Sequence, residues 1–194
     1  MKIPKTYDEH IKTLVSWSLE REYVRMKKVL FNLPKPWTQD PLIQNYKFCN
    51  VNRIDDKETI ALFKWYNEQI AIHGDRDLWF NVAIARWINW SSSVIATGWT
   101  GLTNGYDADD LFARMSKVDE GKFFTGAYMI RGATRGEFPK TPEGVEMFEK
   151  CRNKRYFLAH RVFKGIYDIG APVEGETLES YHNRLNKAYS NGDF

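Results

Sequence analysis

The sequence has little cysteine and no arrangement of residues typical of a metal site. Cys49 and Cys151 are the only cysteines among 194 residues, too few for a disulfide framework. Together with four scattered histidines they give no zinc-binding spacing, so no metal is predicted. We therefore expect a reducing, cytoplasmic environment.

Long hydrophobic runs and the common nucleotide motifs are also absent. No apolar stretch approaches the ~18 residues that a membrane span needs, and no apolar run follows Lys2 as in a secretory signal. The sequence contains no Gly-x-x-x-x-Gly-Lys-Ser/Thr, Gly-x-Gly-x-x-Gly, Gly-x-Ser-x-Gly or His-Glu-x-x-His. These absences argue against a self-contained kinase, a Rossmann enzyme and a common hydrolase. No cofactor is evident, since ATP would have no P-loop.

Aromatic residues are plentiful, and helical periodicity dominates. The 12 Phe, 10 Tyr and 7 Trp supply enough apolar area to exclude a disordered chain. Apolar spacings of three and four, with caps at their ends, predict an all-α, multi-helix domain. Helices are expected at residues 7–31, 41–46, 55–74, 78–92 (continuing over 94–99), 107–117, 142–169 and from 177 onward.

The helix at 78–92 is apolar nearly all round, so we expect it to be central and buried. Residues 122–131 are ambiguous between strand and helix, and residues 132–141 are expected to form a loop. No linker is evident. We expect one helical domain over residues 1–194, with a division into lobes 1–100 and 101–194 as a further expectation.

Three groups of polar residues are candidates for chemistry. Arg53 is able to bind a phosphate while Asp55 or Asp56 orients it or acts as a base; the same residues also suit a helix cap with a local ion pair. Arg86 and Asn89 lie three apart on the apolar helix. They indicate either a buried structural ion pair, with Asp55 or Asp56 as the partner of Arg86, or a polar pocket.

The third group comes from the second half of the chain. The aromatic and basic stretch at 122–132 suggests DNA contacts from Lys122, Tyr128 and Arg131, or core packing with charges that reach solvent. The net charge is only +3, but residues 150–164 carry no acid. This run is compatible with a phosphate-facing patch or a solvated helix face; its candidate DNA-binding residues are Lys154, Arg155 and Arg161. Cys49 has two possible interpretations, a nucleophile or an inert buried thiol.

Several segments resemble one phage-associated family. They are Pro36-Trp37-Thr38-Gln39-Asp40-Pro41, Tyr46-Lys47-Phe48-Cys49-Asn50-Val51 followed by Arg53 and Asp55-Asp56, Asp77-Leu78-Trp79-Phe80-Asn81 with Arg86 and Asn89, and Gly121-Lys122-Phe123-Phe124-Thr125-Gly126-Ala127-Tyr128. The family comprises the α-glutamyl/putrescinyl thymine pyrophosphorylases and the related helical domain of 5-hydroxymethyluracil DNA kinases. Lys47 stands where an arginine is common in this family.

The resemblance implies a role in DNA hypermodification and a fold similar to helical DNA glycosylases. The partner would be duplex DNA with a modified thymine, flipped out of the duplex. Arg53, Asp55, Asp56, Arg86 and Asn89 are the expected catalytic residues. The enzyme class stays open between a pyrophosphorylase-like transferase and a kinase-associated domain.

Family members usually continue into a further hairpin and helix, so we expect a fold that is incomplete at its C-terminus. An alternative is a non-catalytic DNA-binding module that works with a separate kinase or transferase chain. A helical structural or interaction protein is the third possibility. No membrane partner is expected.

Overall fold

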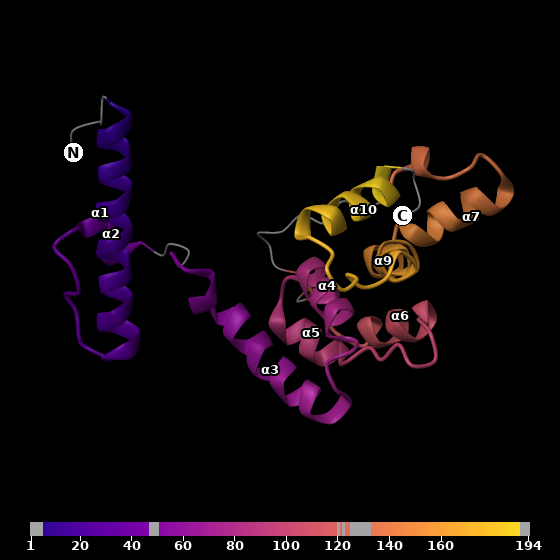
Figure 1. Cartoon of the computed structure of the whole chain (residues 1–194), viewed down its shortest axis with the longest axis horizontal. Helices are drawn as coiled ribbons and strands as arrows, with labels where there is room; N and C mark the ends of the chain where they lie inside the picture. Colours follow the sequence, from indigo (N-terminus) through magenta and orange to yellow (C-terminus); the bar gives the residue numbers. More distant parts are fainter. Residues whose placement is uncertain (1–5, 47–50, 120, 122, 125–132, 191–194) are drawn as a thin grey trace. The chain divides into compact units, whose positions relative to one another are not determined.

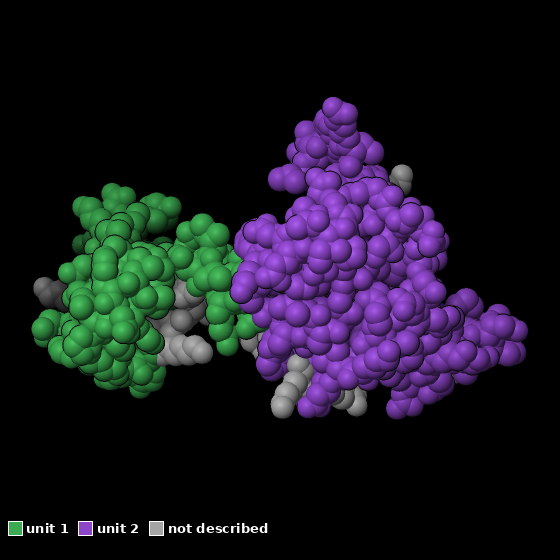
Figure 2. Space-filling view, turned by 90° about the horizontal axis from the view of Figure 1, so that it is seen from below, with its two compact units in different colours: residues 1–60 green, residues 61–194 purple. Residues whose placement is uncertain are grey.

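The computed structural model describes residues 6–46, 51–119, 121, 123–124 and 133–190, and this part of the chain is all-α. The predicted fold class is therefore confirmed. Among these residues no helix has both the length and the apolar character needed to cross a membrane. Contacts divide the chain into unit 1, residues 1–60, and unit 2, residues 61–194 (Figure 2). This division differs from the expected lobes 1–100 and 101–194, and the single domain over 1–194 stays a prediction.

Unit 1 is built around the long helix α1, Tyr7–Arg25, which continues as a π-helical stretch over Met26–Leu30 (Figure 1). Thr6 and Glu9 form a capping box at its start. The short helix α2, Pro41–Asn45, begins where Asp40 accepts hydrogen bonds from the Leu42 and Ile43 amides. A 3-10 turn, Arg53–Asp55, precedes α3, Lys57–His73, which crosses the boundary between the units.

Unit 1 has almost no core. Ile43, which is 7 % exposed, is the one buried side chain among its described residues, 6–46 and 51–60. The apolar positions that predicted an amphipathic first helix are present, but among the described residues of the unit several of them stay largely exposed. For example, Leu19 is 66 % exposed and Tyr23 is 51 % exposed.

Unit 2 contains the hydrophobic core. Its helices are α4, Leu78–Ile88; α5, Ser91–Thr97; α6, Ala108–Ser116; α7, Pro142–Cys151; α8, Lys154–Phe157; α9, Lys164–Ile169; and α10, Leu178–Ser190. A 3-10 turn covers Arg135–Glu137, and a π-helical stretch, Leu158–Phe163, joins α8 to α9. The core is lined by fully buried side chains that include Phe80, Ile88, Leu111, Met115 and Phe163. α4 supplies two of these, which confirms its central position.

A polar clamp ties the loop after α5 to α4. The Asn81 amide donates to the carbonyls of Asp77 and Thr100 at 2.9 and 3.0 Å, and its Oδ1 accepts from the Thr100 amide at 2.9 Å. The Asp77 carboxylate accepts from the Leu102 amide at 2.8 Å. Because Asp77 also pairs with Arg76, the pKa of its carboxyl lies below the usual range. Residues 100–102 are thus held by side chains of α4 and its N-cap.

Two of the expected helices are shorter than predicted. α4 ends at Ile88 because Asn89 adopts the left-handed conformation, with φ 53°, so Asn89 caps the helix instead of extending it. The helix expected over 142–169 is interrupted at Asn153. Its Oδ1 accepts hydrogen bonds from the Arg155 and Tyr156 amides and starts a new helix.

Candidate functional site

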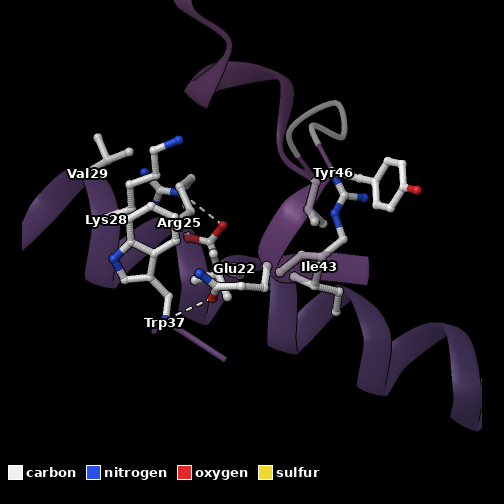
Figure 3. A pocket seen from close by; sticks show the side chains of 11 residues that line it. Glu22, Arg25, Lys28, Val29, Trp37, Ile43 and Tyr46 are labelled. Atoms are coloured by element: carbon white, nitrogen blue, oxygen red, sulfur yellow. Dashed lines mark hydrogen bonds and ion pairs between the residues drawn. The ribbon is translucent and has the colours of Figure 1, made fainter. Parts of the chain in front are cut away.

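A cavity of about 170 Å³ lies in unit 1, between α1 with its π-helical extension and the segment that carries α2 (Figure 3). Three cations, Arg21, Arg25 and Lys28, line it against one carboxylate, Glu22. Trp37 and Tyr46 add aromatic surface to its walls. The cavity therefore combines positive charge with aromatic rings.

The cations share one face of the helix because they are spaced four and three residues apart. Trp37 is fixed opposite them: its indole Nε1 donates to the Leu33 carbonyl at 2.7 Å, and its backbone amide donates to Gln44 Oε1 at 3.0 Å. Lys28 Nζ lies 5.3 Å from the Trp37 ring centroid (Figure 3). Trp37 and Gln44 thus hold the loop before α2 against the cationic face.

Arg25 connects the cavity to Asp55, the first residue of the Asp55-Asp56 pair. Its Nε donates to both Glu22 carboxylate oxygens at 2.9 Å, and its Nη2 donates to Oε1 at 2.5 Å. Nη1 lies 3.3 Å from Asp55 Oδ1. The hydrogen bonds from Arg25 lower the pKa of Glu22, so this carboxylate stays charged and holds the guanidinium in place.

A protein-family model described as "5-hmdU DNA kinase, helical domain" matches residues 8–194. The chain belongs to this family. The match confirms the relationship that the Pro36–Pro41 and Tyr46–Val51 segments predicted. No curated protein and no solved structure matches the chain.

The predicted residues Arg53, Asp55 and Asp56 lie together in unit 1, where Asp55 is 3.3 Å from Arg25, one of the residues that line the cavity. Arg53 Nη1 donates to Asp56 at 3.1 Å, with the Arg53 side chain 73 % exposed. Asp56 also accepts from the Glu58 amide at the start of α3. This geometry is the helix cap with a local ion pair that the sequence offered as one alternative. Their catalytic role stays a prediction.

Arg86 and Asn89 belong to unit 2, and their setting differs from the expected one. Arg86 is exposed on α4, so the argument that burial forces it into an ion pair does not apply. Asn89 is the left-handed cap of the helix. Within unit 1, Asp55 pairs with Arg25 and Asp56 with Arg53. A polar pocket formed by Arg86 and Asn89 stays a prediction.

The expected DNA-binding residues fall into two groups. Lys122, Tyr128 and Arg131, like Cys49, lie outside the described residues. Of the others, Lys154 is exposed, whereas Arg155 is 8 % exposed, with its guanidinium carbon 4.4 Å from the Phe123 ring centroid. The position of Arg155 favours packing in the core over contact with a phosphate.

Arg161, the last of the predicted DNA-binding residues, is half-buried, and its guanidinium lies 5.4 Å from the Phe138 ring. The other cysteine of the chain, Cys151, is fully buried, and burial raises its pKa, which keeps the thiol protonated. In the part of the chain that the structure describes, no cluster of His, Cys, Asp or Glu is arranged to hold a metal.

Arg21, Arg25 and Lys28 were not predicted from the sequence as site residues. No motif contains them, and the helix expected over residues 7–31, on which they lie, was predicted from its apolar positions alone. Their spacing of four and three residues was the available signal, because it places cations on one helix face ahead of the Trp37 turn.

Proposed function

We propose that this chain recognises 5-hydroxymethyluracil, or its phosphorylated or pyrophosphorylated form, in DNA during base hypermodification. The cavity in unit 1 is the proposed recognition site. The observation that carries the proposal is the combination of three cations and Trp37 around one small cavity. The family match supports it, because the matching model is named for a 5-hmdU DNA kinase.

The chemistry of the lining suits such a ligand. Arginine and lysine bind phosphate through charge-assisted hydrogen bonds, and an aromatic ring stacks on a base that has left the duplex. Pockets for drug-sized molecules occupy roughly 300–1,000 Å³. A cavity of about 170 Å³ suits a smaller group, a phosphate or a single base.

A second candidate function is that of a non-catalytic module that delivers DNA to a separate kinase or transferase. The lack of a P-loop in the sequence favours it, because phosphoryl transfer from ATP needs a triphosphate site. The exposed Arg53–Asp56 pair also favours it, since the pair already satisfies both charges without substrate.

The test is binding of the purified chain to duplexes that contain thymine, hydroxymethyluracil or phosphorylated hydroxymethyluracil, at several salt concentrations. We expect tighter binding to modified DNA, and loss of that preference in Trp37→Leu. Tyr7→Leu is the matched control, because Tyr7 is an exposed aromatic residue of α1 outside the cavity. Equal binding to all duplexes would refute base recognition, and no binding by a folded chain would favour the structural or interaction protein.

An assay for release of phosphate or pyrophosphate from modified DNA separates the enzyme from the delivery module. Arg53→Ala and Asp56→Asn should abolish turnover if these residues are catalytic, with thermal melts close to that of the unmodified chain. Selective binding without turnover would support the module.

A further inference from the structure

Gln44 of α2 is held in one orientation by the backbone of the loop before the helix. Its Oε1 accepts hydrogen bonds from the amides of Trp37, at 3.0 Å (Figure 3), and Thr38, at 3.4 Å. Exchange of the side-chain oxygen and nitrogen would set an NH2 group against two N–H donors. The oxygen of Gln44 is therefore fixed on the side of Trp37, and the nitrogen Nε2 faces away from these two amides.

Nε2 of Gln44 is an open donor on the wall of the cavity. Gln44 is half-buried and lines the cavity together with Trp37. Among the residues that the structure describes, no atom accepts a hydrogen bond from Nε2. An NH2 group carries two hydrogens to donate, and a ligand that fills the cavity displaces the water that would otherwise accept them.

The acceptors of the cavity wall are engaged already. Gln44 Oε1 takes the two backbone amides, and the Glu22 carboxylate takes three hydrogen bonds from Arg25. The other charged side chains that line the cavity are cations. The wall therefore suits the edge of a ligand that accepts hydrogen bonds better than an edge that donates them.

We propose that Gln44 determines which base the cavity accepts, because its Nε2 donates to the C4 carbonyl oxygen of a uracil ring stacked on Trp37. At the same ring position cytosine carries an amino group, which is a donor and would oppose Nε2. A base that has left the duplex presents this edge without its pairing partner. The role of Gln44 rests on the proposed recognition of modified uracil in DNA.

The place of the base substituent agrees with this role. The 5-substituent of hydroxymethyluracil is attached to the ring atom next to C4, so it lies beside the C4 oxygen. A donor for that oxygen and cations for a phosphate on the substituent must therefore share one small site. Gln44 and the three cations Arg21, Arg25 and Lys28 line the same cavity of about 170 Å³. The cations suit the phosphate, and the neutral amide suits the carbonyl.

Gln44→Glu tests this role because it replaces the open donor by an acceptor of nearly the same shape. One carboxylate oxygen can still accept from the Trp37 and Thr38 amides, so the loop keeps its hydrogen bonds, while the other oxygen faces the base. Gln39→Glu is the matched control. It adds the same charge to an exposed residue of the same loop that does not line this cavity.

The probes are labelled duplexes with one 5-hydroxymethyluracil or one 5-hydroxymethylcytosine, which share the 5-substituent and differ at the pairing edge. Fluorescence anisotropy gives the ratio of the two affinities for each variant. The stability of the base pair affects this ratio equally in all variants. We expect the unmodified chain and Gln39→Glu to give the same ratio, and Gln44→Glu to lower the preference for hydroxymethyluracil roughly tenfold. Both Glu variants should bind all DNA more weakly, because each adds a negative charge.

A second measurement on the unmodified chain covers the case that Gln44→Glu does not fold. Replacement of the C4 oxygen of the modified uracil by sulfur, a weaker acceptor, should weaken binding several-fold. Sulfur also weakens the base pair, which by itself would favour the flipped base, so weaker binding cannot come from pairing.

The outcomes separate the role of Gln44 from the proposed function. The same ratio for Gln44→Glu and Gln39→Glu, or undiminished binding of the sulfur analogue, would overturn the role of Gln44 while a preference for hydroxymethyluracil over thymine still stands. Equal binding of thymine and hydroxymethyluracil duplexes by the unmodified chain would overturn the proposed function and the role of Gln44 with it.

Discussion

Substitution of Lys28 by methionine removes one charge from the proposed DNA site with little effect on the fold. Lys28 is exposed, and its Nζ lies 5.3 Å from the Trp37 ring centroid. An exposed cation–π contact contributes about 0.5–1 kcal/mol. For a chain of this size that loss lowers the melting temperature by about 1–4 °C.

The effect on DNA binding should be larger and should depend on salt. Each phosphate neutralised by a cation adds about 0.9 to the slope of log K against log salt concentration. If Lys28 contacts one phosphate, Lys28→Met reduces the slope by that amount. The affinity deficit of the variant then shrinks by about 3- to 4-fold between roughly 50 and 200 mM salt.

Fluorescence anisotropy with a labelled duplex at four or more salt concentrations measures this slope. Lys64→Met is the matched control, because Lys64 is an exposed lysine of α3 that does not line the cavity. A slope for Lys28→Met equal to that of the unmodified chain would refute the assignment of the cavity to phosphate.

The remaining predictions concern unit 2. Gly144→Ala should destabilise the chain by about 1–3 kcal/mol, because a Cβ there would lie 2.1 Å from the Pro139 carbonyl oxygen; Gly136→Ala, with open space around it, is the control in chemical denaturation. Asn153→Ala should cost about 1 kcal/mol through loss of the α8 cap, and Asn153→Asp should restore most of it. Burial lowers the pKa of His160, so the folded state takes up its proton less readily than the unfolded chain. The free energy of unfolding is therefore highest above the ordinary histidine pKa of 6.5, and it decreases as the pH falls from there through the lower pKa of the folded state. The melting temperature of His160→Gln should depend less on pH over this range.

Each of these predictions has an outcome that contradicts it. Equal stability of Gly144→Ala and Gly136→Ala would show that the loop at Pro139 yields without cost. An Asn153→Asp chain as unstable as Asn153→Ala would exclude capping as the cause. Identical pH profiles for His160→Gln and the unmodified chain would exclude His160 as the titrating group.

The helices were predictable where local chemistry determines them. Pro41, with Thr38 or Asp40 as the possible cap before it, predicted the start of α2, and the nearly continuous apolar character of residues 78–92 predicted the central helix. The interruption at Asn153 was not predicted because the apolar spacing continues past it, and only the side-chain cap reveals the new start. The end of α4 at Asn89 was missed because a left-handed residue leaves no periodic signal.

The candidate site depended more on tertiary contacts. The pairing of Arg25 with Glu22 was readable, since they lie three residues apart on one helix. Its contact with Asp55 joins residues 30 positions apart, and spacing alone does not show it. The basic run gave equal weight to Lys154 and Arg155, although packing exposes the first and buries the second.

The polar clamp between α4 and residues 100–102 has a consequence for amide hydrogen exchange. The amides of Thr100 and Leu102 lie outside any helix, yet they donate to the side chains of Asn81 and Asp77. Asn81 belongs to the helix that supplies Phe80 and Ile88 to the core, and Thr100 is itself buried, so we expect the Thr100 amide to exchange only when that packing opens. Thr100 should therefore retain its proton about as long as the interior amides of α4, whereas Leu102, which is half-buried and donates to the N-cap residue Asp77, should exchange sooner.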